Sequence, residues 1–197
     1  MKRFFDLALG SVLLVALSPI MILIGILVVI TMGRPVFFRQ MRPGLNGAAF
    51  ELIKFRTMSA GLAPDGSLAS DAERLSKVGK WLREWSLDEL PELINIVRGE
   101  MSFVGPRPLL MEYMPRYNVE QSRRHEVRPG LTGWAQVNGR NELSWNDRFA
   151  LDVWYVDHRS FALDMKILLL TLARVITREG ISQSGRATME PFRGDSD

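Results

Sequence analysis

The chain of 197 residues contains no cysteine and only two histidines. The lack of cysteine excludes a disulfide framework, a thiolate metal site and a cysteine nucleophile. It also agrees with a reducing compartment, because disulfides form and persist in oxidising ones. The two histidines, His125 and His158, stand in charged surroundings without the spacing of metal ligands, so no role is assigned to them.

Charge is missing from one long stretch, because no charged residue occurs at positions 7–33. As a straight helix this run would span about 40 Å at 1.5 Å per residue, against about 30 Å for the hydrocarbon core of a bilayer. Pro19 cannot donate a backbone hydrogen bond and its ring clashes with the Val15 carbonyl, which predicts a kink near Ser18. The Ser18 hydroxyl is available for a carbonyl freed by that kink. The run is too long for a secretory signal and lacks its cleavage site.

Basic residues flank the uncharged run on both sides. They are Lys2, Arg3, Arg34, Arg39, Arg42, Lys54 and Arg56. Because basic residues favour the cytoplasmic side of a membrane, a simple spanning helix would place one of the two clusters on the wrong side. A broken helix that enters one leaflet, turns at Ser18-Pro19 and returns keeps both clusters cytoplasmic. On these residues alone, a transmembrane anchor and a re-entrant hairpin both stay open.

The composition of the chain limits the kinds of partner that it is expected to bind. About 160 residues follow the uncharged run, enough for one compact domain. The net charge is only +3, but 20 of the 25 basic residues are arginine. Guanidinium groups bind phosphate through paired hydrogen bonds, so phosphate-bearing ligands or lipid headgroups are expected partners. The lack of a basic helix, an aromatic-rich binding motif and a zinc finger argues against nucleic acid.

Turn signals and hydrophobic periodicity divide the domain into short elements. Two extended segments, 34–39 and 50–56, predict a small β-hairpin. The periodicity predicts helices over 71–85, 86–98, 145–155 and 164–179, the last one capped by Asp164. Trp81 and Trp85 share one face of the first helix, as they would on an interfacial helix at a membrane surface or on a core stripe. An irregular polar tail is expected from residue 182 onward.

An acidic pair, Asp88 and Glu89, lies where a helix is expected to begin, and Ser86 stands three residues before Glu89 as in a capping box. Acids are common at this position because they complement the helix dipole, so the spacing alone favours a structural role. The same free amides would hold Asp88 ionised and attract a phosphate. An ionised aspartate can attack phosphorus, and two adjacent carboxylates also recruit Mg²⁺. Asp88 and Glu89 are therefore the candidate catalytic residues, and Asp88 the candidate metal ligand.

Basic residues in stiff or glycine-containing segments are candidates for the phosphate side of a site. Arg107 is bracketed by two prolines, which restrict the backbone around it. The segment 128–133 combines an arginine, a hydroxyl and two glycines that permit close approach of the backbone to an anion. Taken singly, each segment is better explained as a rigid loop with a solvated arginine, and Asp152 as an ion-pair partner of a nearby arginine such as Arg148. The candidates are Lys54, Arg56, Arg107, Pro108, Arg128, Thr132 and Arg140.

In combination, these segments resemble the small monotopic phosphoglycosyl transferases of bacteria, which initiate glycoconjugate assembly. The resemblance runs from Lys2 to about Gly194. Its motifs are Ser18-Pro19, Lys54-Phe55-Arg56-Thr57-Met58, Ser86-Leu87-Asp88-Glu89-Leu90-Pro91, the segment 101–109 and Arg128-Pro129-Gly130-Leu131-Thr132-Gly133. It implies an α+β, mostly helical fold: a re-entrant membrane segment over 1–34, a compact cytoplasmic catalytic domain with a β-hairpin and interfacial amphipathic helices over 35–181, and a tail over 182–197.

The resemblance also implies a reaction. Such enzymes transfer a sugar 1-phosphate from a UDP-sugar to undecaprenyl phosphate, require Mg²⁺ and release UMP. By this analogy Asp88 is the nucleophile and contacts Mg²⁺, Glu89 assists the lipid phosphate, and Arg107 holds phosphate. The enzyme is then expected at the cytoplasmic face of the bacterial inner membrane, touching lipid headgroups, with both termini cytoplasmic and a homodimer left open. The segment 185–194 resembles the tail of members that act on UDP-N,N'-diacetylbacillosamine.

Two hypotheses for a non-enzymatic function remain beside the hypothesis of an enzyme. A membrane-anchored, non-catalytic scaffold of a glycan pathway would be indifferent to substitution of Asp88. A peripheral binder of lipid phosphates would need the arginines but not the pair of Asp88 and Glu89. Release of UMP from a UDP-sugar separates both of them from the enzyme.

Overall fold

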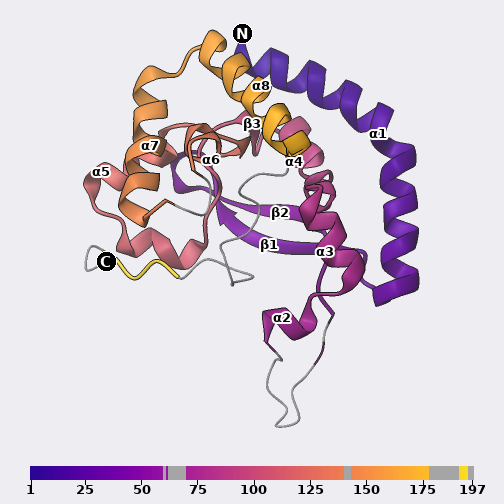
Figure 1. Cartoon of the computed structure of the whole chain (residues 1–197). Helices are drawn as coiled ribbons and strands as arrows, with labels where there is room; N and C mark the ends of the chain where they lie inside the picture. Colours follow the sequence, from indigo (N-terminus) through magenta and orange to yellow (C-terminus); the bar gives the residue numbers. More distant parts are fainter. Residues whose placement is uncertain (60, 62–69, 140–142, 178–190, 195–197) are drawn as a thin grey trace.

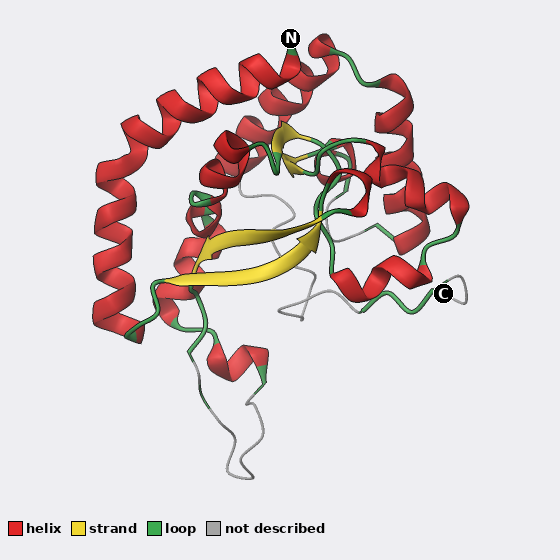
Figure 2. Cartoon of the chain, turned by 180° about the vertical axis from the view of Figure 1, so that it is seen from behind, coloured by secondary structure: helices red, strands yellow, loops and turns green. Residues whose placement is uncertain are grey.

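The computed structural model describes residues 1–59, 61, 70–139, 143–177 and 191–194. Within these ranges, helices surround two small β-sheets (Figure 1, Figure 2). The elements are α1 Lys2–Met32, β1 Phe37–Pro43, β2 Ala49–Phe55, α2 Asp71–Arg74, α3 Lys77–Glu84, α4 Glu92–Arg98, β3 Ser102–Val104, α5 Val119–Ser122, β4 Gly130–Thr132, α6 Trp134–Val137, α7 Trp145–His158 and α8 Phe161–Thr177. Short 3₁₀ turns lie at Leu45–Gly47, Leu87–Glu89, Met111–Arg116 and Arg123–Glu126. The mostly helical fold with a small hairpin is as predicted.

Helix α1 bends near its middle, so that its two halves run in different directions (Figure 1). Pro19 lies inside the helix, and the Ser18 hydroxyl donates a hydrogen bond of 2.7 Å to the Val15 carbonyl. That carbonyl stands four residues before Pro19 and cannot have its usual helical partner there. The predicted kink and the predicted role of Ser18 are confirmed. In the described part of the chain, α1 is the one helix long and apolar enough to cross a membrane.

Both ends of α1 are bound to the same folded body. Lys2 forms an ion pair of 2.5 Å with Asp164 of α8, and Arg3 donates to two carbonyls at the end of α4. At the other end of the helix, the Arg56 guanidinium donates to the carbonyls of Met32 and the residue that follows it. These contacts cap the exposed ends of two helices with cations, which is the favourable sign for helix C-termini.

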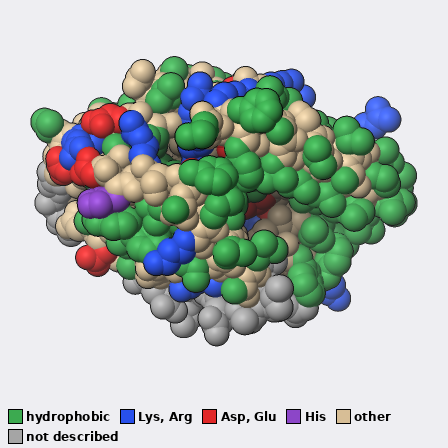
Figure 3. Space-filling view, turned by 90° about the horizontal axis from the view of Figure 1, so that it is seen from above, with side chains coloured by type: hydrophobic (Ala, Val, Ile, Leu, Met, Phe, Trp, Pro, Cys, Tyr) green, Lys and Arg blue, Asp and Glu red, His purple; other side chains and the backbone are tan. Residues whose placement is uncertain are grey.

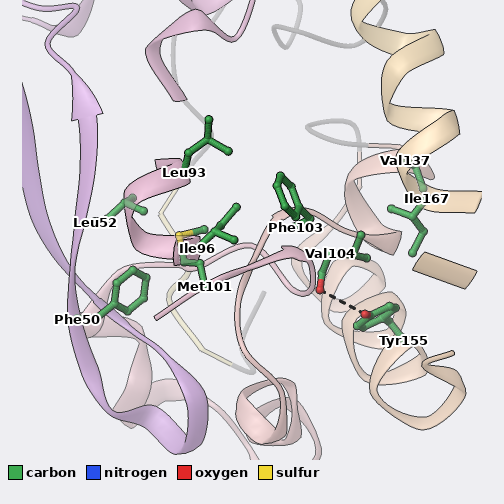
Figure 4. Close-up of a cluster of buried hydrophobic side chains, with 10 residues drawn as sticks. All are labelled: Phe50, Leu52, Leu93, Ile96, Met101, Phe103, Val104, Val137, Tyr155 and Ile167. Atoms are coloured by element: carbon green, nitrogen blue, oxygen red, sulfur yellow. Dashed lines mark hydrogen bonds between the residues drawn. The ribbon is translucent and has the colours of Figure 1, made fainter. Parts of the chain in front are cut away.

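Each half of α1 completes a different hydrophobic core. Leu13 and Leu17 of the first half pack against the larger core, whereas Ile24 and Val28 of the second half belong to a smaller one with Phe55 and Leu82. The buried members of the larger core are Phe50, Leu52, Leu93, Ile96, Met101, Phe103, Val104, Val137, Tyr155 and Ile167 (Figure 4). The helix is therefore part of the packing of the domain.

The predicted β-hairpin is confirmed as an antiparallel pair of β1 and β2, with Phe37 opposite Phe55 and Pro43 opposite Ala49. Asn46 joins the strands in a left-handed conformation, with φ 54°. The side-chain amide of Asn95 on α4 accepts from the Ile53 amide and donates to a carbonyl of β2. This buried amide fixes the hairpin against α4, next to the segment that holds Asp88.

A second, parallel pair of three-residue strands, β3 and β4, was not predicted. The segments around Arg107 and Arg128 were expected to be separate rigid loops, but the structure places them side by side. A Cβ atom on Gly130 would lie 2.1 Å from the Gly105 nitrogen, so these glycines permit the two backbones to touch. The expectation that the glycines make room for an anion is corrected accordingly, because another segment of backbone occupies that space.

Several helix boundaries also differ from prediction. The helix expected over 71–85 is split into α2 and α3, because Ser76 adopts an extended conformation and caps α3 by accepting from the Gly79 amide. Helix α7 is confirmed and runs three residues further than expected. Helix α8 begins at Phe161, with Ser160 accepting from the Leu163 amide, so the predicted capping role of Asp164 is wrong. The Asp164 carboxylate is buried and instead binds Lys2 and the Tyr155 hydroxyl.

The end of the chain contributes an anchor that the sequence did not indicate. Phe192 is 1% exposed, and its ring lies 5.0 Å from that of Phe149 and 5.5 Å from that of Trp145. The Arg116 guanidinium donates to the Phe192 carbonyl. The residues before it in the predicted tail, 182–190, lie outside the described part of the chain. The expectation of a wholly irregular polar tail is therefore corrected at this residue.

Candidate active site

A cavity of about 950 Å³ lies between the hairpin, the turn that carries Asp88, and helices α6 to α8. Six of the candidate residues line it, namely Lys54, Arg56, Asp88, Glu89, Arg107 and Thr132. They come from four separate segments of the chain. The fold therefore brings together the motifs that the sequence analysis had singled out at distant positions.

Glu89 is the centre of the charged part of the cavity. Its Oε1 atom accepts a hydrogen bond of 2.7 Å from the Lys54 ammonium and one of 2.6 Å from the Arg107 guanidinium. Lys54 also lies 3.0 Å from an oxygen of Glu92, which is 2% exposed. Two cations and two carboxylates thus form one network, in which each charge has a partner of opposite sign.

The turn that positions the acidic pair differs from the predicted helix start. Ser86 adopts a left-handed conformation with φ 53° and makes no capping bond, so the capping-box prediction is wrong. A 3₁₀ turn over Leu87–Glu89 follows, and α4 begins only at Glu92. A non-glycine residue with positive φ is uncommon and costs conformational energy, which is typical of functional sites. This turn directs Asp88 and Glu89 into the cavity instead of along a helix end.

The electrostatic setting separates the two acids. Burial, followed by the neighbouring charge of Glu89, raises the pKa of Asp88 to about 6, so the expectation that a helix end favours its ionised form is corrected. Burial also acts to raise the pKa of Glu89, but Arg107 and Lys54 outweigh it and hold that pKa well below its usual range. Burial and Glu89 raise the pKa of Glu92 to about 7, against the opposing effect of Lys54. At neutral pH Asp88 and Glu89 are therefore mainly ionised, and Asp88 is the more easily protonated.

Asp88 is the carboxylate left available in this network. Within the described part of the chain its side chain forms no hydrogen bond and no close ion pair, while Glu89 is engaged by two cations. Asp88 is 8% exposed and lines the cavity. A buried, ionised carboxylate without a close partner is a suitable nucleophile or metal ligand.

The carboxylate of Asp88 can serve as one ligand of a magnesium ion. Mg²⁺ binds through one or two carboxylates and completes its shell with water and substrate phosphates. Among the described residues, no group of three or more His, Asp or Glu side chains is arranged around a common metal position. Asp88 can therefore supply one ligand, and phosphate oxygens of a substrate have to supply others.

The polypeptide around Arg107 is held from several sides. Arg124 donates to the Arg107 carbonyl at 2.8 Å, and the same guanidinium forms a buried ion pair of 2.7 Å with Asp152. Asp152 is therefore an ion-pair partner as predicted, and Arg124 is its partner in this ion pair. Arg42 lies 3.5 Å from the carbonyl of Pro108, which is itself buried and does not line the cavity. These contacts fix the backbone that presents the Arg107 side chain.

The other phosphate-binding candidates have diverse surroundings. Arg56 reaches the cavity but also donates to the last carbonyls of α1. Thr132 bonds through its hydroxyl to the hydroxyl of Thr171 at 2.7 Å. Arg128 donates to the Gly99 carbonyl at 2.8 Å and does not line the cavity. Arg140 lies outside the described residues.

The sequence analysis did not single out several charged residues of this region, among them Arg42, Glu92 and Arg148. Arg42 and Arg148 line the cavity, and Glu92 lies behind Lys54. Desolvation and the charge of Arg107 lower the pKa of Arg42, which indicates that its surroundings are rich in positive charge. Arg148 stacks on the Trp145 ring at 5.0 Å. The position of Arg42 directly before the Pro43-Gly44 turn, near the end of an extended segment, was the available signal.

Comparisons with known proteins identify the family of the chain. The sequence profile described as bacterial sugar transferase matches residues 1–178. The chain is 52% identical over 197 residues to the uncharacterized sugar transferase EpsL of Bacillus subtilis strain 168, covering 100% of this chain and 98% of that protein. It is 37% identical to the UDP-glucose:undecaprenyl-phosphate glucose-1-phosphate transferase of Caulobacter vibrioides, covering 90% and 70%. It is 40% identical to the undecaprenyl-phosphate glucose phosphotransferase of Komagataeibacter xylinus, covering 89% and 36%.

The chain belongs to the bacterial sugar transferase family. The resemblance to phosphoglycosyl transferases inferred from its motifs is confirmed, and with it the enzyme class.

Proposed function

We propose that this protein transfers a sugar 1-phosphate from a UDP-sugar to undecaprenyl phosphate and releases UMP. The names of two relatives support the substrate class, because both act on undecaprenyl phosphate. The observation that carries the proposal is the cavity in which an available, ionised Asp88 lies beside Lys54, Glu89 and Arg107. This set combines a nucleophile with cations that can receive phosphate groups.

In the first step, an oxygen of the Asp88 carboxylate attacks the phosphorus linked to the sugar. The bond between that phosphorus and the bridging oxygen breaks, and the electron pair leaves with UMP. Arg107 and Lys54 stabilise the negative charge that builds up on the phosphate oxygens. Mg²⁺, held by Asp88 and the diphosphate, would supply further charge neutralisation. The product is an aspartyl phospho-sugar.

In the second step, an oxygen of the lipid phosphate attacks the same phosphorus, and the bond to Asp88 breaks. The carboxylate is restored and the sugar is joined to the lipid through a diphosphate. The low pKa of Glu89 makes it a poor proton acceptor, so its assistance consists of holding Lys54 and Arg107 in place. Splitting the transfer in two avoids bringing two polyanionic phosphates together in one step.

A membrane arrangement follows from the same proposal. The bent helix α1 enters the cytoplasmic leaflet, turns at Pro19 and returns, so that both termini and the catalytic domain stay on the cytoplasmic face of the bacterial inner membrane. Its support is that both ends of α1 bind the same folded body. Trp81 and Trp85, 44% and 36% exposed, are available to contact lipid headgroups.

The sugar is proposed to be an N-acetylated amino sugar, on the likeness of the segment 185–194 to relatives that use a diacetylated bacillosamine. Glucose is the competing donor, because relatives named for glucose transfer align with this chain. The enzyme would then carry out the first membrane step of glycoconjugate assembly.

The test is UMP release from the full chain in lipid discs with Mg²⁺, undecaprenyl phosphate and a panel of UDP-sugars. We expect release with one or few sugars, and none with the Asp88→Asn variant. Omitting the acceptor should leave a single burst of UMP, about one per enzyme, if the covalent intermediate forms. If folded protein releases no UMP with any sugar of the panel, a non-catalytic scaffold is favoured. If UMP is released in the presence of the acceptor but no burst occurs in its absence, the result would argue for direct transfer between the two phosphates.

A further inference from the structure

The lining of the cavity combines two kinds of chemistry. It includes the charged network of Lys54, Glu89 and Arg107. It also includes Leu13 and Leu17 of α1 and Leu168 of α8. We call these three leucines and the space between them the apolar arm. Because Leu13 and Leu17 are four residues apart, they lie on the same face of α1.

Two helices form the walls of the apolar arm. Helices α1 and α8 meet at their first turns, where the rings of Phe5 and Phe161 are 5.4 Å apart and Lys2 binds Asp164. Figure 1 shows the two helices diverging from this junction. Leu168 stands about one turn beyond Asp164 on α8 and lines the cavity, so the arm lies where the helices have separated.

The outer surfaces of the same helices are strongly apolar. Val12 and Val15 of α1 are 64% and 74% exposed, and Leu169 and Leu172 of α8 are 68% and 60% exposed. An exposed apolar patch that spans two helices marks a contact with lipid or with another apolar partner. Figure 3 shows a hollow in this face, rimmed by hydrophobic side chains and with acidic and basic side chains at its bottom. The charged site therefore opens toward the face that suits lipid.

We propose that the apolar arm binds the first isoprene units of the polyprenyl phosphate acceptor, which enters sideways from the bilayer between α1 and α8. This inference rests on the proposed function, because the phosphate at the head of the chain has to meet Lys54 and Arg107. A polar nucleotide sugar gains nothing from leucine side chains, whereas an isoprenoid chain buries its methyl groups against them. The volume of about 950 Å³ is near the upper end for small-molecule sites, which leaves room for a second substrate.

The first test uses the absence of cysteine from the chain. Leu168→Cys carries a single thiol in the apolar arm, and Leu169→Cys is the matched control on the outer face of α8. The rate of reaction with N-ethylmaleimide is measured in detergent, with and without undecaprenyl phosphate. We expect the acceptor to slow the reaction at least about fivefold at position 168 and to leave position 169 unchanged. Phosphatidic acid at the same concentration should not slow the reaction of the thiol at position 168.

Three results would overturn the proposal. They are the same rate at position 168 with and without undecaprenyl phosphate, equal protection at position 169, and equal protection by phosphatidic acid. The last result would mean that the arm takes any lipid phosphate and does not recognise the isoprenoid chain. Because the test measures binding alone, it can be read even if the enzyme transfers no sugar.

The second test separates the acceptor from the donor. Leu168→Trp fills the arm, so KM for undecaprenyl phosphate should rise at least about tenfold, while the burst of UMP without acceptor keeps its size and rate. Leu169→Trp should change neither quantity by more than about twofold. An unchanged KM, or an equal loss of burst and acceptor step, would contradict the proposal. A parent enzyme that releases no UMP at all would instead refute the proposed function.

Discussion

The guanidinium of Arg107 and the carboxylate of Glu89 are joined by a hydrogen bond of 2.6 Å at the edge of the cavity. Arg107 follows the strand β3, and Glu89 lies in the turn before α4, so this one contact joins two segments that are distant in the sequence. The attraction is strong enough to keep Glu89 ionised in a buried position and to raise the pKa of Arg107 further above its usual range.

Replacing Glu89 by glutamine should expose this dependence. The Glu89→Gln variant removes the charge that holds Lys54 and Arg107, so we expect the acceptor step to slow at least about a hundredfold. The negative charge of Glu89 also raises the pKa of Asp88, so its removal should move the acid limb of UMP release to lower pH. The measurement is the burst rate as a function of pH. An acid limb that stays in place would show that burial alone sets the pKa of Asp88.

The pH dependence of the parent enzyme is a separate prediction. In the proposed mechanism the nucleophile is the ionised form of Asp88, whose pKa is raised to about 6 by burial and by Glu89. The rate of UMP release should therefore be level near pH 8 and fall about tenfold per unit well below pH 6. Single-turnover kinetics without acceptor measure this step directly. A limb near pH 4 would mean that Asp88 is not desolvated in the working enzyme.

Loss of the nucleophile should stabilise the fold. The pKa of Asp88 is raised from 3.8 to about 6 in the folded protein, so folding favours the protonated form and the buried charge costs stability above that pH. Asp88→Asn removes the charge, and we expect a gain of about 1–3 kcal/mol at pH 8, or several degrees in Tm. The gain should shrink as the pH falls below 6 and vanish below about 4.

Thermal unfolding at pH 8 and pH 4 checks the gain from Asp88→Asn. The matched control is Glu84→Gln, which changes a carboxylate on the surface of α3 that is 41% exposed. Its effect should stay within about 0.5 kcal/mol at both pH values. If Asp88→Asn is less stable than the parent at pH 8, burial of the ionised Asp88 carboxylate does not destabilise the fold, and this prediction is contradicted.

The proline in α1 can be tested for its part in topology. Pro19→Ala restores the backbone donor and removes the ring clash, so a fraction of the chains should straighten and span the bilayer. Labelling of a cysteine added before Met1 with an impermeant maleimide on intact cells should then increase. Ser18→Ala removes only the bond to Val15 and keeps the proline, so its labelling should match that of the parent. If the added cysteine is labelled to the same low extent in the parent, the Pro19→Ala variant and the Ser18→Ala variant, the kink does not determine the membrane topology.

The aromatic anchor of the tail should contribute measurably to stability. Phe192 is 1% exposed and touches the rings of Tyr113, Tyr117, Trp145 and Phe149. Phe192→Ala should lower the free energy of unfolding by about 3–5 kcal/mol in denaturant titration, less if the site collapses. Pro191→Ala, at an exposed neighbouring position, is the control and should change little. A small loss at Phe192 would mean that the segment is held elsewhere.

The features predicted well from sequence are those with local causes. The kink at Pro19 follows from the chemistry of one residue, and the hairpin follows from turn residues between two extended segments. The sequence also singled out Asp88 and Arg107 as candidates, because they lie in recognisable motifs, and both line the cavity. Their catalytic roles stay predictions. Their mutual geometry did not follow, since the contact of Arg107 with Glu89 depends on a fold of distant segments.

The features that were not predicted from the sequence depend on the tertiary structure. The left-handed backbone of Ser86 and the short parallel pair of β3 and β4 leave no periodic pattern, because three residues are too few to show one. Asp164 has the sequence position of a helix cap, but the Lys2 ammonium, 162 residues away, determines its actual role. Phe192 was hidden in a polar tail, where a single aromatic residue carries no period. For the paired strands, Asp164 and Phe192, a partner far along the chain overrides the local signal.

The packing of α1 into two cores has a consequence for biogenesis. This helix leaves the ribosome before the groups that hold its start, at Asp164 and Tyr155, have been synthesised. In the membrane arrangement proposed above, α1 reaches the bilayer while these partners do not yet exist, and the later segments assemble on a helix that is already in place. A chain in which α1 is not in place would lack one wall of each core, so insertion of this helix and folding of the domain are coupled.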